Sequence, residues 1–460
     1  MGKFQIFYPG QYTEREQKGL EIYQAKIKEL EDRGPIDVQA LISGKIEKGT
    51  QGFSNILEVK EDMMLYNANK FDPATELYTD DAVAQKHGYK AKIAMPGFSA
   101  HDDSFLTAFP GEARDMMCVN GLNHALTQLA PIYAGDTLYL VKDKIELFDL
   151  TPAEGSEYRN FYIRCSGSVY NQDGVKVTEC MFSARENLKS WASEADKDPS
   201  VRPWESPDWW VRPEHYYTDE DWQKIFDIWA NENPRGDVPL YWEDVQIGDM
   251  PNPTLDGPIE QSSNPTPPYG MAVNGSRTMK ELADPAVRAA MTRDEKTGIY
   301  YPQDMTELIP EVPPYDDPRK KMGPPPGEAP GPKPEPKRAI FINFMGRDFA
   351  TRHINNWMGY YGWIKNIRWG IMTDPVEQGY HFPKNTYATD FIAPVPALAG
   401  RKSTTHGMQH DVMLIRSQVY DKYINDAGEH IVELGWWIEE INGEMYEEGG
   451  ATIILPSREG

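Results

Sequence analysis

The sequence predicts an α+β protein in which a long helix is wrapped by a curved antiparallel sheet, with this unit present twice in one chain. Three observations lead to this prediction. Residues 346–366 carry apolar side chains at helical spacing, each half of the chain ends in three segments of alternating polarity, and a tight turn joins the last two segments of each half. The two halves share this order of elements although few residues are identical, so we expect a structural repeat.

The segment 346–366 is the element around which the prediction is organised. Its apolar residues fall on one side of a helix, and they are Ala350, Ile354, Trp357, Met358, Tyr361 and Ile364. Most charged and amide side chains fall on the other sides, which predicts a half-buried helix. The sequence from residue 367 onwards is strand-like, so we expect the helix to pack on a sheet.

The first half begins with an amphipathic helix over residues 13–33, which has an acidic first turn and ends near Gly34. A turn then leads into a short helix at residues 80–87. Alternation of period two predicts three antiparallel strands, at residues 137–148, 159–170 and 175–182. A turn at 172–174 joins the last two strands.

Residues 188–240 are predicted to connect the halves, because prolines interrupt them and only one helix is indicated. A capping box at 218–221 precedes that helix. Its tryptophans, Trp222 and Trp229, could form a partner surface or pack in a core, and core packing is favoured because large aromatic side chains dominate cores.

The first half is expected to span residues 1–187 and the second half residues 241–460. A tract rich in proline, glycine and lysine at 311–338 predicts an exposed, extended insertion in the second half. Three strands are predicted to end the chain, at residues 411–420, 429–439 and 445–455. The Asn-Gly pair at 442–443 is the strongest hairpin signal in the sequence and joins the last two strands.

Composition and charge exclude several classes of function. A formal net charge of −24 over 460 residues argues against sequence-independent binding to DNA, RNA or anionic lipid. No segment reaches the roughly 18 continuous apolar residues that a membrane-spanning helix needs. The three cysteines, Cys118, Cys165 and Cys180, show no metal-binding spacing. We therefore expect a reduced, cytoplasmic protein without a membrane anchor.

Asp348 and His353 come nearest to an acid/base pair in the sequence. Five steps along a regular helix separate two side chains by about 140°. The two groups therefore cannot share a water molecule unless the helix is broken between them. For His353 two interpretations stay open, an acid/base role and a core histidine that is hydrogen-bonded to a backbone carbonyl.

His406 and His410 lie four residues apart, and Asp411 follows them. On a helix this spacing would suit a metal ion. Gly407 and the loop-like surroundings disfavour that interpretation, so we expect no metal and no other cofactor. The alternative places both histidines in the wall of a pocket.

Four stretches of the sequence resemble the MaoC-like (R)-specific enoyl-CoA hydratase family. They are DDAVAQKHGYKAKIAMPG at 80–97, AGDTL at 134–138, WEDVQIGD at 242–249 and NWMG at 356–359. The matches cover most of both halves in patches and occur in the family's order. The resemblance implies a hot-dog fold, doubled within one chain, and reversible addition of water to the double bond of an acyl thioester.

The family places an Asp and a His five residues apart in an Asp-x-Asn-Pro-x-His turn, where they position and activate the water. In the first half of this chain Tyr78 stands at the His position, Pro73 with Asp72 beside it at the Asp position, and Thr75 at the Asn position. This turn is expected to be non-catalytic, with Tyr78 and Asp72 as a vestigial counterpart that contacts the substrate. In the second half no full motif precedes the helix, but Asp348 and His353 reproduce the spacing.

The resemblance implies a cofactor-free hydro-lyase that acts on an enoyl-CoA or hydroxyacyl-CoA. Arg347 and Arg352 belong to a local basic cluster, which would either form surface salt bridges or contact the phosphates of coenzyme A. Two alternatives stay open: a non-catalytic hot-dog subunit that supports an active partner, because the motif is missing, and a hot-dog acyl-CoA thioesterase. A homo-oligomer, or a hetero-oligomer with another hot-dog subunit, is expected.

Overall fold

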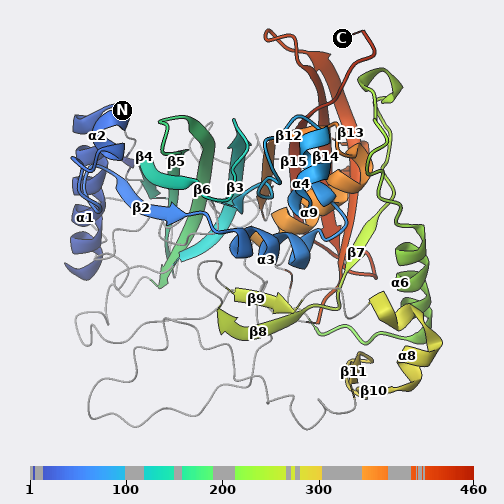
Figure 1. Ribbon diagram of the computed structural model, residues 1–460. Helices are drawn as coiled ribbons and strands as arrows, with labels where there is room; N and C mark the ends of the chain where they lie inside the picture. Colours follow the sequence, from blue (N-terminus) through green and yellow to red (C-terminus); the bar gives the residue numbers. More distant parts are fainter. Residues whose placement is uncertain are drawn as a thin grey trace.

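The structure is a computed structural model, and it describes residues 4–5, 14–98, 119–149, 158–189, 213–265, 271–274, 280–302, 344–370, 395–399, 401, 407 and 410–459 (Figure 1). His406 and the predicted insertion at 311–338 lie outside these ranges. Within them, helices pack against one large, mainly antiparallel sheet of eleven strands. The predicted fold class, an α+β protein with two hot-dog units, is confirmed.

Each half of the chain contributes five corresponding strands to this sheet, and the first half adds a sixth, β1 (Phe4–Gln5). The first half provides β2 (Phe53–Glu58), β3 (Val119–Gln128), β4 (Thr137–Asp149), β5 (Tyr158–Tyr170) and β6 (Lys176–Lys189). The second half provides β7 (Thr254–Asp256), β12 (Trp363–Gly370), β13 (Met413–Ile424), β14 (His430–Glu439) and β15 (Met445–Ile454). A further strand, β1 (Phe4–Gln5), pairs in parallel with β4.

Both halves use the same strand order. The sheet runs β4-β5-β6-β3 through the first half and continues as β12-β15-β14-β13 through the second. In each half, therefore, three consecutive strands form a meander, and the last of them pairs with the strand that precedes the meander in the chain. Strands β2 and β7 lie at equivalent places beside β4 and β13. This confirms the repeat predicted from the order of elements.

Tight turns close the last hairpin of each half, as predicted. Gly174 and Gly443 have φ angles of +78° and +87°, a region that glycine adopts without steric strain. An asparagine stabilises each turn: Asn171 Oδ1 accepts hydrogen bonds from the N–H groups of Asp173 and Val175, and Asn442 Oδ1 accepts one from the N–H of Glu444. Local sequence therefore determines the register of these hairpins.

The two halves are joined where β3 pairs with β12, through five residue pairs that begin with Asn366 opposite Thr127. Directly opposed residues in an antiparallel sheet point to the same face. One row of side chains therefore crosses both halves, and it consists of Phe182, His124, Trp369, Gly449, Trp436 and Ser417. The central helix packs on this face of the sheet.

That helix, α9 (Phe344–Met358), packs on β12 and β13 and buries the predicted residues Ala350 and Ile354 completely. It ends eight residues earlier than predicted, because Gly359 adopts a φ of +70°, as glycine often does just past a helix end. The prediction was therefore wrong for Tyr361, which lies beyond the helix and is 43% exposed.

The structure describes six further α-helices. They are α1 (Glu14–Arg33), α2 (Val38–Ile42), α3 (Glu61–Phe71), α4 (Asp81–Lys86), α6 (Asp219–Asn231) and α8 (Pro285–Ala289). Two small hairpins, β8 (Glu260–Pro265) with β9 (Met271–Asn274) and β10 (Met291–Arg293) with β11 (Tyr300–Pro302), complete the described strands.

Side-chain caps begin two of the predicted helices. Asp80 Oδ1 accepts hydrogen bonds from the N–H groups at the start of α4, which occupies unpaired donors of the first turn. The capping box predicted at 218–221 is present, because Thr218 and Asp221 each accept from the other's backbone N–H. Helix α6 therefore begins where the sequence predicted.

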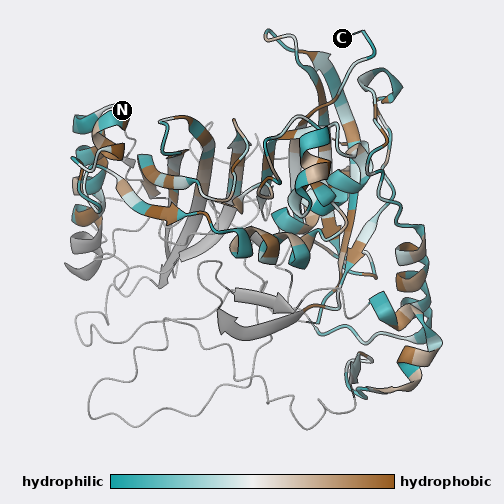
Figure 2. Cartoon of the chain, viewed as in Figure 1, coloured by the Kyte–Doolittle hydropathy of each residue, from teal (hydrophilic) through white to brown (hydrophobic). Residues whose placement is uncertain are grey.

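Hydrophobic packing divides into a large shared core and smaller clusters. The large core contains residues of both halves, among them Leu126 of β3 and Ile367 of β12. A second cluster surrounds α6, where Trp222 and Trp229 are buried, so their predicted core packing is confirmed. Figure 2 shows the matching alternation of hydrophilic and hydrophobic residues along α6 and the described part of α1.

Among the described helices, none combines the length and the apolar character that crossing a bilayer requires.

Candidate functional site

Asp348 lies near the amino end of α9, on its second described turn, and is fully buried. Its Oδ1 atom accepts hydrogen bonds from Nε (2.9 Å) and Nη2 (2.7 Å) of Arg347, which is also fully buried. Burial raises the pKa of Asp348 to about 6, against the opposing effect of the Arg347 charge. Asp348 is therefore mostly ionised at neutral pH but close to a pH at which it takes up a proton.

A second carboxyl group, that of Glu447, lies beside Asp348. It comes from β15 and packs against Gly346 of α9, where any side chain would collide with its carboxyl oxygens. Burial, and then the negative charge of Asp348, raise the pKa of Glu447 well above its ordinary value. Its Oε1 atom has no hydrogen-bond partner in the described part of the chain. Glu447 therefore holds its proton more tightly than an exposed glutamate does.

Glu447 is not among the site residues predicted from the sequence, although its position carries a recognisable signal. Alternate residues of β15 from Glu447 to Ile453 point inwards, and apart from Glu447 they are apolar or small. A lone glutamate on the inward face of a strand is uncommon, because burying a carboxyl group is unfavourable unless it is paired or protonated.

A buried histidine that the sequence did not single out lies on the same face of the sheet. His124 of β3 stacks on Trp369 with ring centres 4.9 Å apart and an angle of 7°. Burial, with a smaller contribution from the charge of Arg347, lowers the pKa of His124 to about 3. The Arg347 guanidinium in turn lies 5.3 Å from the Trp369 ring centre. His124 is therefore neutral across the physiological range.

His353 lies in a different environment from Asp348. Its Nε2 atom hydrogen-bonds to Ser417 Oγ at 2.7 Å, and its Nδ1 atom to Thr254 Oγ1 at 3.2 Å. Burial, and then the charge of Arg352, lower the pKa of His353 to about 3. Both ring nitrogens are occupied by hydroxyl groups, so this geometry favours the core interpretation, with hydroxyl groups in place of the expected carbonyl. The acid/base role of His353 stays a prediction without geometric support.

Arg352 takes part in a buried ion network rather than in a surface cluster. Its Nη1 atom lies 2.8 Å from Glu232 Oε2 and its Nη2 atom 2.5 Å from Asp256 Oδ2. Lys280 adds a second cation on Glu232. Burial disfavours the charged form of Arg352, but the negative charges of Asp256 and Glu232 together have the larger effect, so the pKa of Arg352 is raised. Arg347 and Arg352 are both buried and paired with carboxylates, so contact with coenzyme A phosphates, and equally a surface salt bridge, does not fit their positions.

The degenerate turn of the first half contacts the central helix of the second half. Asn355 Nδ2 of α9 donates to Asp72 Oδ2 at 2.7 Å and to Tyr78 Oη at 2.9 Å. All three side chains are buried. Burial raises the pKa values of Asp72 and Tyr78. The predicted substrate contacts of Asp72 and Tyr78 are thus replaced, in this structure, by a bridge between the two halves.

Loss of this bridge should be measurable. Replacing Asn355 with alanine leaves a buried carboxyl and a buried hydroxyl without their shared donor, and we expect a loss of about 1–3 kcal/mol in the free energy of unfolding. Urea denaturation measures it. Tyr78→Phe removes only one of the two bonds and should have the smaller effect; equal stability of Asn355→Ala and wild type would contradict the proposed bridge.

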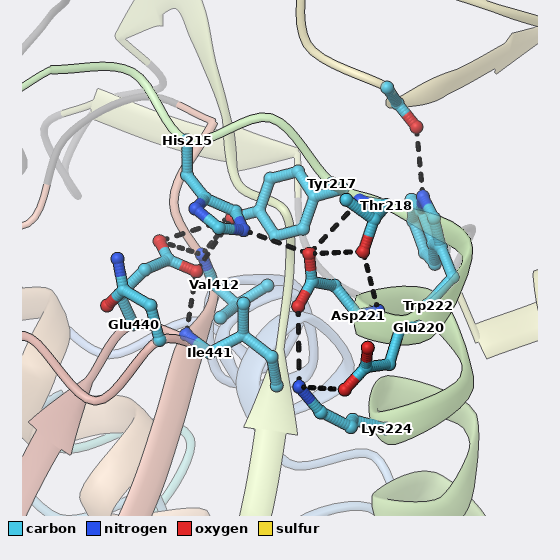
Figure 3. A network of polar contacts seen from close by, with 12 residues as sticks. His215, Tyr217, Thr218, Glu220, Asp221, Trp222, Lys224, Val412, Glu440 and Ile441 are labelled. Atoms are coloured by element: carbon cyan, nitrogen blue, oxygen red, sulfur yellow. Dashed lines mark hydrogen bonds and ion pairs between the residues drawn. The ribbon is translucent and has the colours of Figure 1, made fainter.

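His410 belongs to the docking site of the connector. Its backbone carbonyl accepts a hydrogen bond from Tyr217 Oη at 2.8 Å, and its ring bonds to Glu214. Tyr217 Oη donates to Glu440 Oε1 at 3.0 Å and accepts a hydrogen bond from the N–H of Val412. Figure 3 shows Tyr217, Glu440 and Val412 side by side. Here His410 holds the connector against the end of β14, and its place in a pocket wall stays a prediction.

In the part of the chain that the structure describes, no three His, Cys, Asp or Glu side chains lie close enough together to hold a metal ion.

The pKa of Glu447 predicts a specific dependence of stability on pH. A carboxyl whose folded pKa is raised holds its proton more tightly when folded, so stability falls as pH rises from about 4.5 through the folded pKa. Glu447→Gln cannot ionise and escapes this loss. We expect the variant and wild type to be alike near pH 4 and the variant to gain stability relative to wild type as pH rises.

Denaturant titrations at several pH values check this expectation. Glu58→Gln, on an exposed position of β2, is a matched control that should keep the wild-type pH dependence. A stability difference between Glu447→Gln and wild type that stays the same at every pH would mean that folding does not shift the pKa of Glu447.

Three solved structures are similar to most of this chain. A MaoC-like dehydratase is 13% identical, with 88% of this chain and 98% of that chain covered and a TM-score of 0.41. A putative MaoC domain protein dehydratase from Chloroflexus aurantiacus is 12% identical, with 88% and 94% covered and a TM-score of 0.41. A conserved hypothetical protein from Mycobacterium tuberculosis with a double hot-dog fold is 10% identical, with 92% and 98% covered and a TM-score of 0.39.

No family model matches the sequence, and a search of curated proteins finds no match. MaoC-like dehydratases, whose family four stretches of the sequence resemble, are among the solved structures that are similar to this chain.

Proposed function

We propose that this protein is a hydro-lyase that adds water to, or removes it from, an acyl-CoA thioester, with Asp348 as the base and Glu447 as the acid. The observation that carries the proposal is the pair of buried carboxyl groups at the amino end of α9. Their surroundings push the two pKa values apart, because Arg347 neighbours Asp348 while Glu447 faces the charge of Asp348. Pairs of this kind suit acid/base chemistry at neutral pH.

Hydration of an enoyl thioester requires both protonation states at once. The carboxylate of Asp348 takes a proton from water while the water oxygen attacks the β carbon, and the electron pair of the double bond moves towards the thioester oxygen. Glu447 then gives its proton to the α carbon. The amino end of α9 carries a partial positive charge, which stabilises the developing enolate.

A spectroscopic assay tests the proposal. Enoyl-CoA substrates from crotonyl-CoA to long-chain acyl groups lose the absorbance of the conjugated thioester when they are hydrated. We expect turnover of at least one chain length, and absence of turnover across the panel would contradict the proposal. A thiol-reactive dye in the same reactions detects the thioesterase alternative, because only hydrolysis releases free thiol.

A non-catalytic subunit is the second candidate, and two observations favour it. Asp348 is fully buried, and the degenerate turn at Asp72 and Tyr78 is closed by Asn355. In this case the chain would support an active hot-dog partner that carries an intact Asp-x-Asn-Pro-x-His turn. Co-purification of such a partner, with activity only in the complex, would support this function.

We place the protein in the cytoplasm. The cysteines that the structure describes, Cys165 and Cys180, are free and buried, and burial raises the pKa of both thiols. Free thiols are common in reducing compartments, where disulfides do not persist.

A further inference from the structure

Lys70 is a partly buried lysine without a carboxylate partner. It lies in the last turn of α3, and within the described part of the chain its Nζ atom forms no ion pair and no hydrogen bond. Other partly buried lysines are paired, as Lys280 is with Glu232 and Lys365 with Glu429. Charge pairing therefore does not explain why the amine of Lys70 is partly buried.

Two aromatic rings stand where a counter-ion would be expected. The Nζ atom lies 5.6 Å from the ring centre of Tyr66 and 5.4 Å from that of Phe71. The rings attract an ammonium group weakly, and they also keep water away from it. Burial lowers the pKa of Lys70 to about 8, against the opposing effect of the Asp348 charge. At pH 7 roughly a tenth of the amine is therefore unprotonated, far more than for an exposed lysine.

The amine remains open to solvent and lies near the second half of the chain. Its Nζ atom has no hydrogen-bond partner but keeps surface in contact with solvent. The ring of Phe71 contacts the ring of Phe349 on α9 edge-on, with ring centres 5.6 Å apart. Phe349 follows Asp348 directly, and the charges of Lys70 and Asp348 shift each other's pKa. A dissolved reagent can therefore reach a nucleophilic nitrogen beside the proposed reaction site.

We propose that Lys70 is a self-acylation site, whose amine takes the acyl group from an acyl thioester. The lone pair of the unprotonated nitrogen attacks the thioester carbonyl carbon, the C–S bond breaks, and an amide forms. The nitrogen releases one proton and the leaving thiolate takes one up, so the step needs no oxidant and no third reactant. The modified side chain is neutral. This step requires only a thioester in solution and does not depend on the hydro-lyase activity.

Acetyl-CoA is the probe, and mass spectrometry of peptides from the folded full-length protein measures the acetylated fraction of each lysine. Lys60 is the matched control, because it is exposed and precedes the same helix. We expect Lys70 to react at least fivefold faster than Lys60 at neutral pH. Its rate should level off above about pH 9, while the rate at Lys60 keeps rising. Equal rates, or parallel pH dependences, would overturn the proposal.

Tyr66→Ser tests whether the aromatic surroundings cause the reactivity. Tyr66 is 40% exposed, so its replacement should hardly affect folding. It admits water to the amine, and acetylation of Lys70 should slow towards the rate at Lys60. Tyr423→Ser, which changes an equally exposed tyrosine of the second half, should leave the rate at Lys70 within twofold of wild type. Equal acetylation of Lys70 in both variants would overturn the role of the rings.

Acylation of Lys70 also has an effect on the reaction, and this part rests on the proposed function. The charge of Lys70 lowers the pKa of Asp348, as that of Arg347 does, so its loss raises this pKa. Lys70→Gln mimics the neutral amide and should move the acid limb of kcat/KM to higher pH by a few tenths of a unit. An unmoved limb would overturn this effect. If no turnover is found, the proposed function fails, while the acetylation rates still decide on Lys70.

Discussion

Replacing Arg352 with methionine is expected to lower the free energy of unfolding by about 3–5 kcal/mol, because breaking a buried ion pair leaves its partner charges uncompensated. Arg352 neutralises two buried carboxylates, Glu232 and Asp256, on different elements. Methionine fills a similar volume but supplies no charge. Urea denaturation at neutral pH measures the loss directly.

Two control experiments test whether the loss of stability comes from the uncompensated charges. Lys28→Met removes an exposed i,i+4 pair with Asp32 on α1, and such pairs contribute little, so stability should hardly change. Adding Glu232→Gln and Asp256→Asn to Arg352→Met removes the uncompensated charges and should recover part of the loss. If Arg352→Met were as stable as wild type, water would have to reach the network, contrary to its burial.

Replacing Asp348 with asparagine is expected to lower kcat by about 10²- to 10⁴-fold, the range for loss of a general base. Asparagine keeps the shape and can still accept a hydrogen bond from Arg347, so the change acts mainly on proton transfer. In the wild type, kcat/KM should fall as pH drops below about 6, because the Asp348 carboxylate then becomes protonated. The variant should lose this dependence.

Asp143→Asn is the matched control for Asp348→Asn. Asp143 is a partly buried carboxyl of β4 whose pKa burial also raises, but it lies in the first half, away from α9. Its substitution should leave kcat and the pH profile unchanged. Circular dichroism of both variants confirms folding, and an active Asp348→Asn enzyme with the wild-type profile would remove Asp348 from the mechanism.

The sequence predicted the elements that local pattern determines. The meander strands alternate clearly, and their turns contain glycine where φ must be positive, as at Gly174 and Gly443. Strand β3 was not predicted, because its sequence carries Asn120, Asn123 and His124 and its place depends on pairing with β12. That pairing joins segments distant in sequence, which no local pattern reveals.

The residues of the candidate site also divide into those that local pattern predicts and those that depend on contacts between distant segments. Asp348 was found because its position on a helix is readable from periodicity. His353 hydrogen-bonds to Ser417 and Thr254, which lie on two separate strands. These contacts join distant parts of the sequence, so they could not be predicted from local pattern. The helix geometry nevertheless indicated correctly that Asp348 and His353 point in different directions, as their separate partners show.

The pairing of β3 with β12 also limits how this protein can be divided. If the chain were cut within the connector, β12 in one fragment and β3 in the other would become exposed edge strands of eight and ten residues. The unpaired backbone N–H and C=O groups of an edge strand can pair with other chains. Separate expression of either half should therefore yield aggregates, whereas co-expressed halves have a ready template for reassembly. Each half therefore depends on the other to cover its edge strand, whether the two are joined in one chain or supplied as two.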